Sequence, residues 1–160
     1  MRTYRIVVGV DGSDGGVRAL RWALQQARVR GGAVRAVMTY DWTGTEAAYL
    51  AGLGADGERV RAEALLDGIV DDVRREYAEV PVSSEVLLGQ AGHKLAEAAK
   101  AADLLVVGSH GHSRLHHAVM GSVSEACVRH ATCPVVIVPV PVMQVEAVVR
   151  SKEAVLPRSA

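Results

Sequence analysis

The chain has 160 residues, and its 18 basic and 18 acidic side chains give a formal net charge of zero. This length suits a single domain with a substantial core, and the balanced charge argues against nucleic-acid or membrane binding, which would need a basic excess. Because no apolar run approaches the roughly twenty residues of a membrane span and no signal-peptide pattern opens the chain, we expect a cytoplasmic protein.

Apolar runs alternate with turn residues along the chain, and this pattern predicts strands and helices in turn. The first run predicts a strand at 4–10, and a helix from about 15 to 30 follows it, with Ser13 or Asp14 as N-cap. The remaining expected elements are a strand at 33–40, a long loop at 41–57, a helix at 58–79, a strand at 83–88, a helix at 91–102, a strand at 104–107, a helix at 122–131 and a strand at 133–139.

This alternation predicts an α/β fold in which right-handed crossovers join successive strands. We expect a single doubly wound domain, a five-stranded parallel sheet in the order 3-2-1-4-5 with helices on both faces. Residues 1–140 would form this domain, and residues 141–160 would be a C-terminal extension, either a short helix or a frayed tail.

Residues 104–122, LLVVGSHGHSRLHHAVMGS, combine an apolar strand with three glycines and the start of a helix. The glycines are Gly108, Gly111 and Gly121, and Ser122 follows the last of them. Glycine lets the backbone approach a ligand closely, the first N–H groups of a helix lack partners within it, and the helix dipole favours negative charge. The stretch therefore predicts a phosphate-binding loop.

A carboxylate, Asp11, stands at the end of the first strand. In the expected strand order, the first and fourth strands meet at the switch point of the sheet, where ligands bind at the carboxyl ends of strands. Asp11 and Gly108 would therefore face one crevice, where a carboxylate suits a ribose diol and N–H groups suit phosphate. The structural alternatives are that Asp11 is a turn residue of DGSDG and that Ser122 caps a helix.

These features together resemble the universal stress protein family, in particular its nucleotide-binding members. The resemblance rests on VVGVDGS at 7–13, on DLLVVGSHG at 103–111, on the spacing G-x2-G-x9-G-S, and on GSVSEACVRHATCPVVIVP at 121–139. It covers residue 5 to about residue 139 and implies an adenine nucleotide alpha hydrolase-like fold.

The resemblance implies an ATP site, with or without Mg²⁺. The glycines of the spacing and Ser122 would hold the phosphates and ribose, Asp11 would accept hydrogen bonds from the ribose hydroxyls, and residues 37–39 would lie against adenine. The expected nucleotide-binding residues are Val10, Asp11, Gly12, Thr39, Gly108, Ser109, His110, Gly111, Gly121, Ser122 and Val123, with Arg114 as an additional phosphate contact.

The expected fifth strand, 133–139, is apolar and would lie at a sheet edge, which must be covered to prevent unwanted pairing. In the family that the chain resembles, this strand often pairs with its symmetry mate, so we expect a homodimer. Folding of the C-terminal extension over the strand is the alternative.

The segment between the second and third glycines is commonly small and apolar in the family, but here it holds His112, His116 and His117, and His110 lies just before it. Imidazole suits zinc, nickel and copper, but no cysteine or carboxylate accompanies these side chains at ligand spacing, so no metal ligand is assigned. The alternatives are exposed loop residues or side chains that assist the phosphates together with Arg114. In the latter case, histidine protonation near neutral pH would make nucleotide affinity pH-dependent.

The function that these features favour is a nucleotide-binding regulatory or stress-response protein, which acts through ATP-dependent conformation or through a protein partner. One alternative is a slow ATP-hydrolysing or autophosphorylating enzyme, with Ser122 or Ser124 as acceptor, and another is a dimeric interaction module without nucleotide. No catalytic residue is assigned, because Walker A and GxSxG motifs are absent and residues 109–112, SHGH, do not match HxGH. Cys127 and Cys133 are predicted to be buried reduced thiols.

Overall fold

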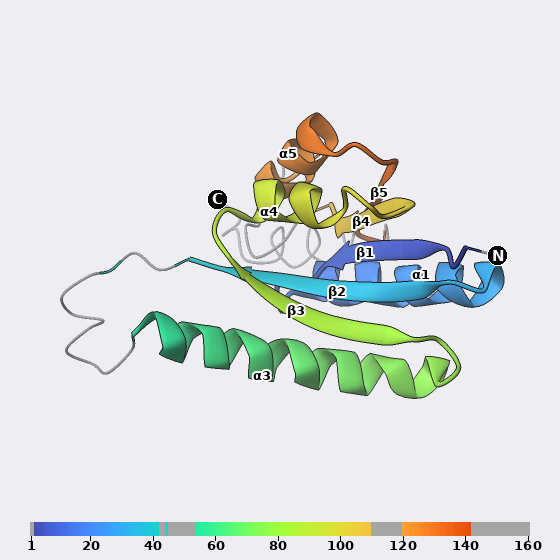
Figure 1. Cartoon of the computed structure of the whole chain (residues 1–160), viewed down its shortest axis with the longest axis horizontal. Helices are drawn as coiled ribbons and strands as arrows, with labels where there is room; N and C mark the ends of the chain where they lie inside the picture. Colours follow the sequence, from blue (N-terminus) through green and yellow to red (C-terminus); the bar gives the residue numbers. More distant parts are fainter. Residues whose placement is uncertain (1, 42–43, 45–53, 110–119, 142–160) are drawn as a thin grey trace, which may run out of the picture.

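The computed structural model describes residues 2–41, 44, 54–109 and 120–141, and these residues form one five-stranded parallel sheet. The sheet has the order β3-β2-β1-β4-β5, which confirms the predicted topology (Figure 1). Its strands are β1 (Arg5–Gly9), β2 (Ala33–Tyr40), β3 (Val82–Leu88), β4 (Leu104–Gly108) and β5 (Val135–Val138).

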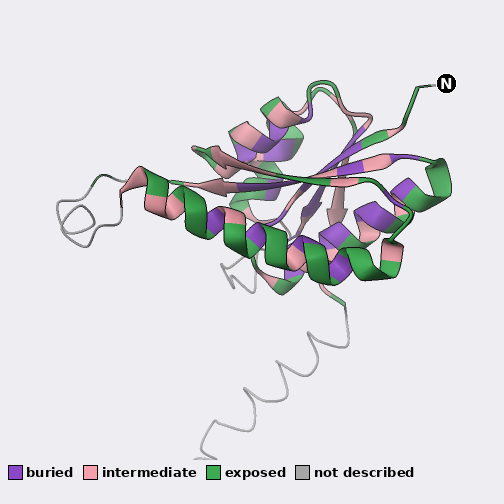
Figure 2. Ribbon diagram, turned by 60° about the horizontal axis from the view of Figure 1, so that its bottom comes forward, coloured by how far each residue is buried: buried purple, intermediate pink, exposed green. Residues whose placement is uncertain are grey.

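Helices cover both faces of the sheet, as expected for a doubly wound fold (Figures 1 and 2). The helices are α1 (Asp14–Arg30), α3 (Ala55–Arg74) with the 3₁₀ turn η1 (Arg75–Tyr77), α4 (Ala91–Ala98) and α5 (Ser122–His130). One apolar cluster joins the sheet to α1 and α3, and a second joins the opposite face to α4 and α5. Because β1 and β4 lie between the two clusters, their central residues are buried and apolar.

Helix α1 begins and ends at the capping residues that its sequence predicts. Ser13 is the N-cap, and its Oγ accepts a hydrogen bond from the backbone N–H of Gly16 at 3.2 Å. Gly31 ends the helix in the left-handed conformation, with φ of 62°, which glycine adopts without a steric penalty. The helix is thus set between two residues whose chemistry defines its ends.

Helix α3 differs from the predicted helix at 58–79 at both ends. It begins at Ala55 because the N–H groups of Gly57 and Glu58 bond to the carbonyl oxygen of Gly54. It ends at Arg74, and the chain then tightens into η1. Its buried residues recur at helical spacing on the side that faces the sheet; they are Ala62, Leu66, Val70 and Val73.

Two other predicted elements are shorter by three or more residues in the structure. The helix predicted at 91–102 ends at Ala98, because the N–H groups of Lys100 and Ala102 bond three residues back rather than four. The strand predicted at 133–139 is reduced to β5, although the carbonyl of Pro134 already accepts from the N–H of Leu105. The ends of both elements are set by tertiary contacts and local turns that an apolar run does not reveal.

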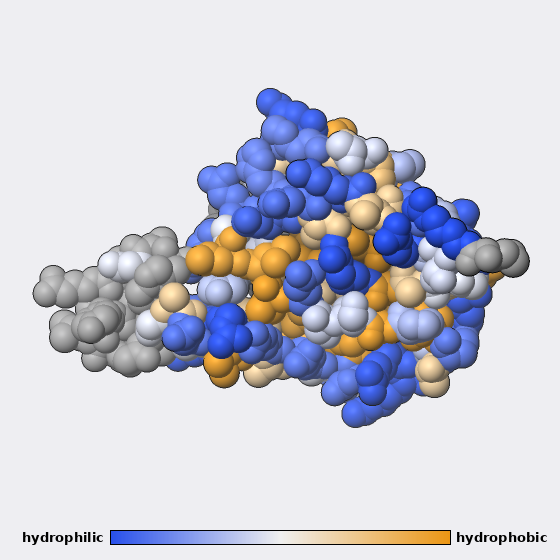
Figure 3. Space-filling model, viewed as in Figure 1, coloured by the Kyte–Doolittle hydropathy of each residue, from blue (hydrophilic) through white to orange (hydrophobic). Residues whose placement is uncertain are grey.

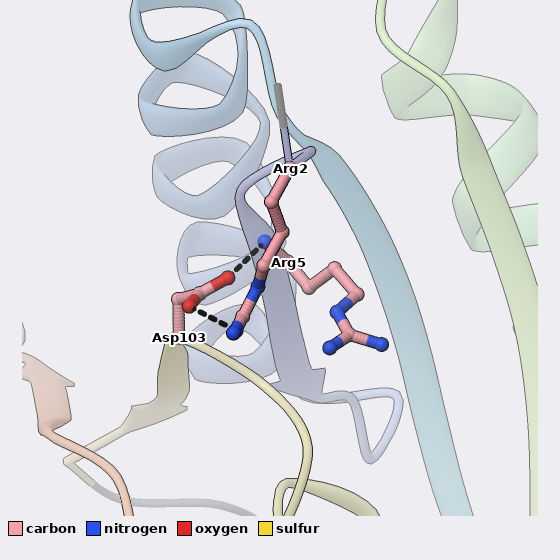
Figure 4. Close-up of polar contacts among 3 residues, drawn as sticks. All are labelled: Arg2, Arg5 and Asp103. Carbon is pink, nitrogen blue, oxygen red and sulfur yellow. Dashed lines mark hydrogen bonds and ion pairs between the residues drawn. The ribbon is translucent and has the colours of Figure 1, made fainter.

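A carboxylate clip joins β1 to β4 at the amino ends of the strands (Figure 4). Asp103 Oδ2 accepts a hydrogen bond from the N–H of Arg5 at 2.8 Å, and Oδ1 pairs with Arg2 Nη2 at 2.6 Å. The N–H of Asp103 in turn donates to the carbonyl of Arg5 at 2.8 Å. The clip holds the register of the two central strands at the end of the sheet opposite their carboxyl ends.

The surface reflects the incomplete cover of the edge strand β3. In the view of Figure 3, apolar surface gathers over the region of β2 and β3, between polar surfaces over α4 and α3. Val82, Val86 and Leu87 of β3 are half-buried, in keeping with a strand that pairs on one side only. None of the helices in the described part of the chain has the length and apolar character to cross a bilayer.

Replacement of Gly68 by alanine is expected to stabilise the protein. Gly68 lies inside α3 on its exposed side, and nothing lies within 4 Å of an added Cβ. The free energy of unfolding should rise by about 0.5–1 kcal/mol, because glycine loses more backbone entropy than alanine in a helix. Chemical denaturation of Gly68→Ala measures the change.

The matched control is Gly31→Ala, the same chemical change at a residue with φ of 62°. It should destabilise the protein, because an alanine side chain is strained in the left-handed region. A loss of stability in Gly68→Ala would contradict the assignment of this residue to a regular, exposed helix turn.

Candidate functional site

A cavity of about 310 Å³ opens at the carboxyl ends of β1 and β4, where the strand order reverses. It is lined by the ends of three strands and by the first turns of three helices, α1, α4 and α5. The lining residues are Gly9, Val10, Asp11, Gly16, Val37, Thr39, Ala91, Leu95, Val107, Gly108, Gly121, Ser122, Val123 and Ser124. The switch point that the sequence predicted is therefore hollow.

Asp11 lines the cavity and also organises the turn that leads into α1. Its Oδ1 accepts hydrogen bonds from Ser13, from the backbone N–H at 3.0 Å and from Oγ at 2.5 Å. Gly12 between them has φ of 82°, which reverses the chain direction. A Cβ on Gly16 would lie 2.8 Å from Asp11 Oδ1, so the helix start approaches this carboxylate closely. The turn role considered for Asp11 is confirmed, and it coexists with exposure of the carboxylate to the cavity.

The carboxyl end of β4 is held tightly on both sides. A Cβ on Gly108 would lie 2.9 Å from the backbone carbon and oxygen of Gly15, so only glycine fits against the start of α1. The following residue, Ser109, is 6% exposed, and its N–H donates to the carbonyl of Val138 at 2.9 Å. Its carbonyl accepts from the N–H of Gly121 at 2.8 Å, which brings the start of α5 beside the end of β4.

The N-terminus of α5 faces the cavity without a side-chain cap. Gly121 is the N-cap, and Ser122 is the first helical residue and is exposed. The structural alternative that Ser122 caps the helix is therefore wrong, since the cap position falls one residue earlier. The first N–H groups of a helix have no partners within it and carry partial positive charge, so this end of the cavity favours an anion.

The two serines considered as phosphoryl acceptors differ in accessibility. Ser124 is 2% exposed, and its Oγ donates to the carbonyl of Gly108 at 2.8 Å. Ser122 is exposed at the cavity. Ser124 is thus a structural hydroxyl in this state of the protein.

Apolar side chains form the wall between Asp11 and α5. The side chain of Leu95 in α4 lies over Gly9, where an added Cβ would be 2.8 Å from Leu95 Cδ1. Val37 and Val107 lie beside them in the same apolar cluster. The N–H of Val10 donates to the carbonyl of Val37 at 2.9 Å, which joins the ends of β1 and β2. A flat, apolar ring suits this surface.

The structure brings most of the sequence-predicted residues together. Those that line the cavity are Val10, Asp11, Thr39, Gly108, Gly121, Ser122 and Val123. Gly12 and Ser109 lie next to lining residues but are not part of the lining. His110, Gly111, His112, Arg114, His116 and His117 lie outside the described residues, as does most of the predicted loop 41–57 and of the extension 141–160.

Sequence reasoning missed five lining residues, Gly9, Gly16, Ala91, Leu95 and Val107, and it named Ser124 only as an alternative phosphoryl acceptor. The helix after β3 starts at the same edge of the sheet as every other crossover helix, and this rule could have identified Ala91 and Leu95. The role of Gly16 in the site is seen only in the structure, where Gly16 packs against Asp11.

Burial controls the chemistry of the cysteine next to the site. Cys127 of α5 is fully buried, and its Sγ lies 3.9 Å from the carbonyl oxygen of Gly92 in α4. Burial raises the pKa of Cys127 from its ordinary value of 9.0 to about 11. Burial also raises the pKa of Cys133, which is only half-buried. Both thiols are free; the prediction that they are buried is confirmed for Cys127 and wrong for Cys133.

Proteins of one family are similar to this chain in sequence. The model described as "Universal stress protein family" matches residues 3–139. Universal stress protein Rv2005c of Mycobacterium tuberculosis is 33% identical over 132 residues, which are 82% of this chain and 44% of that protein. Universal stress protein MJ0531 of Methanocaldococcus jannaschii is 30% identical over 145 residues, 86% of this chain and 82% of that protein. The chain thus spans less than half the length of the mycobacterial relative.

This chain aligns with nearly the whole length of several solved structures that have the same fold. Universal stress protein UspA from Lactobacillus plantarum matches with a TM-score of 0.72 at 26% identity, over 86% of this chain and 99% of that one. A universal stress protein in complex with cAMP matches with a TM-score of 0.64 at 27% identity, over 87% of this chain and 98% of that one. A universal stress protein from Archaeoglobus fulgidus in complex with dAMP matches with a TM-score of 0.63 at 25% identity, over 86% of this chain and 98% of that one.

In the native protein, Cys127 is expected to react with iodoacetamide much more slowly than Cys133. The thiolate is the reactive form, and Cys127 is buried and has a raised pKa, so little of it is accessible thiolate. In the unfolded chain the two rates should become equal. Mass spectrometry of alkylated peptides measures both rates. Equal native alkylation rates at pH 8 would contradict the burial of Cys127.

The same pKa shift predicts a loss of stability at alkaline pH. The unfolded thiol ionises near pH 9 and the folded one only near 11, so unfolding releases a proton in this window and stability falls as the pH rises through it. Chemical denaturation on both sides of pH 9 measures this fall in stability.

Proposed function

The chain belongs to the universal stress protein family, and from that membership we propose that it is an ATP-binding stress-response regulator, which acts through nucleotide-dependent conformation or partner binding. The observation that carries the proposal is the cavity at the switch point, which has a carboxylate at one end and an uncapped helix N-terminus at the other. Sugar, phosphate and base each meet a matching chemistry there.

Each part of the nucleotide is assigned to one region of the cavity. Asp11 accepts hydrogen bonds from the ribose hydroxyls, and the backbone N–H groups of 122–124 hold the phosphates. The base lies against the apolar wall of Val37 and Leu95, with Thr39 at its edge. The relatives solved with cAMP and dAMP support an adenine nucleotide as the class of ligand.

The composition of the cavity favours binding over rapid turnover. Among the described lining residues, Asp11 is the only titratable side chain, and its Oδ1 already accepts from Ser13. A nucleophile with an adjacent general base is not present among them, and such a pair is what fast phosphoryl or acyl chemistry uses. Mg²⁺ bound with ATP would be held chiefly by phosphate oxygens and water, since magnesium keeps several waters.

The position of β5 at the edge of the described sheet supports a homodimer as part of the same proposal. The N–H groups of Leu105 and Ser109 in and after β4 donate to the carbonyls of Pro134 and Val138. Since backbone groups alternate along a strand, the polar groups of Ile137 point to the opposite, outer edge. A second copy of the chain pairs along this edge in a two-fold dimer and covers its half-buried valines.

The purified protein is expected to bind ATP, and Gly121→Leu is expected to weaken this binding by about tenfold or more. Gly121 has φ of −74°, so leucine is compatible with the backbone but fills space at the phosphate end of the cavity. A tenfold loss corresponds to about 1.4 kcal/mol, in the range of one lost charged hydrogen bond. Calorimetric titration of nucleotide-free protein with ATP measures the change.

Val128→Leu is the matched control, because Val128 lies on the same helix and is 52% exposed. It should bind ATP as the natural sequence does. Equal affinity of Gly121→Leu and the control would overturn the phosphate assignment. Mass spectrometry of nucleotide released from the denatured protein tests the wider proposal: ATP supports binding, ADP or phosphoserine supports turnover, and failure to bind any adenine nucleotide rejects it.

Light scattering is expected to give twice the chain mass of 16.9 kDa, and Ile137→Pro is expected to give a monomer. Proline removes an outward-facing N–H and leaves the bonds between β4 and β5 in place. Val29→Lys, at a 77% exposed position of α1, should remain a dimer. A folded Ile137→Pro protein that stays dimeric by light scattering would show that the dimer forms elsewhere.

A further inference from the structure

Ser124 is a buried hydroxyl that links the two halves of the phosphate end of the cavity. It is 2% exposed, and its Oγ lies 2.8 Å from the carbonyl oxygen of Gly108 and 3.5 Å from that of Ser109. A hydroxyl has one proton to donate, so the shorter contact is the hydrogen bond. Ser124 therefore satisfies the last carbonyl of β4 from the first turn of α5.

The partner of this hydrogen bond, the end of β4, is itself closely packed. Gly108 packs against the backbone of Gly15, so the end of β4 is enclosed between α1 on one side and Ser124 on the other. The start of α1 also contacts Asp11 through Gly16. The Ser124 bond thus completes a chain of direct contacts that runs from Asp11 through α1 and Gly108 to α5.

We propose that Ser124 is a positioning residue for the nucleotide site, in a proposal that rests on the proposed ATP binding. Its hydrogen bond holds the first turn of α5 against the end of β4, and so sets the N–H groups that hold phosphate relative to the Asp11 carboxylate that holds ribose. Without the hydroxyl, the described contacts leave the bond from Gly121 N–H to the Ser109 carbonyl as the polar tie between α5 and this end of β4.

This role differs from simple stabilisation in what it predicts. A hydroxyl that only stabilised the fold would lower the melting temperature and leave the affinity of the folded protein for ATP unchanged. A positioning hydroxyl changes that affinity, because the phosphate donors are no longer held in place before the ligand arrives. The two roles therefore separate when affinity and stability are measured together.

The test compares Ser124→Ala with Leu66→Val, a core substitution in α3, which is not part of the cavity lining. Both variants should melt at lower temperature, but only Ser124→Ala should bind ATP about tenfold more weakly in calorimetric titration. Ser124→Cys keeps the volume with a weaker donor and should also bind more weakly; it replaces the alanine variant if that one does not fold. Natural affinity in a folded Ser124 variant would overturn the proposal.

Amide hydrogen exchange of the nucleotide-free variants separates this proposal from the proposed function. Ser124→Ala should speed exchange at the start of α5, at the hydrogen-bonded N–H groups of Gly121 and Glu125, relative to Leu66→Val. If the natural protein binds no ATP, the proposed function fails, whereas faster exchange confined to that turn still supports the positioning of α5 by Ser124. Unchanged exchange there would overturn the positioning role whether or not ATP binds.

Discussion

The site depends on the close packing of Gly108 against Gly15, a backbone contact that brings the end of β4 against the start of α1. Any side chain at Gly108 would push these elements apart, because its Cβ would meet backbone atoms that cannot rotate away. From this contact follow the position of Asp11 on one side and, through the hydrogen bond of Ser124, that of α5 on the other. A ligand crevice at a switch point is thus built from contacts between element ends.

The two ends of the sheet are organised in opposite ways. At the amino ends, Asp103 satisfies the N–H of Arg5 and pairs with Arg2, so the polar groups of the chain meet one another (Figure 4). At the carboxyl ends, three helix N-termini converge on a cavity, and that of α5 has no side-chain cap. Polar groups that are satisfied internally stabilise a fold, whereas helix donors that face a cavity are available to a ligand.

Helices α1 and α4, on opposite faces of the sheet, give the cavity a polar side and an apolar side. Helix α1 is long, capped by Ser13, and contributes glycines that allow close approach. Helix α4 is short and contributes Leu95, whose side chain covers Gly9 and forms the apolar wall. A ligand with an anionic part, a diol and a flat apolar part meets each of these surfaces at once. This combination favours the proposed adenine nucleotide over a simple anion as the ligand.

The sequence by itself determined the strand order, narrowed the cap of α1 to Ser13 or Asp14, and placed Asp11 and Gly108 at one crevice at the switch point. It could do so because apolar periodicity, capping chemistry and crossover handedness are local or rule-based. Tertiary structure decided what depends on contact between distant residues. The ends of α3 and α4, the cap at Gly121 in place of Ser122, the wall formed by Leu95 and the bond of Ser124 to Gly108 each need a partner far along the chain or a turn set by packing. No local pattern encodes such a partner, since it exists only once the sheet has formed.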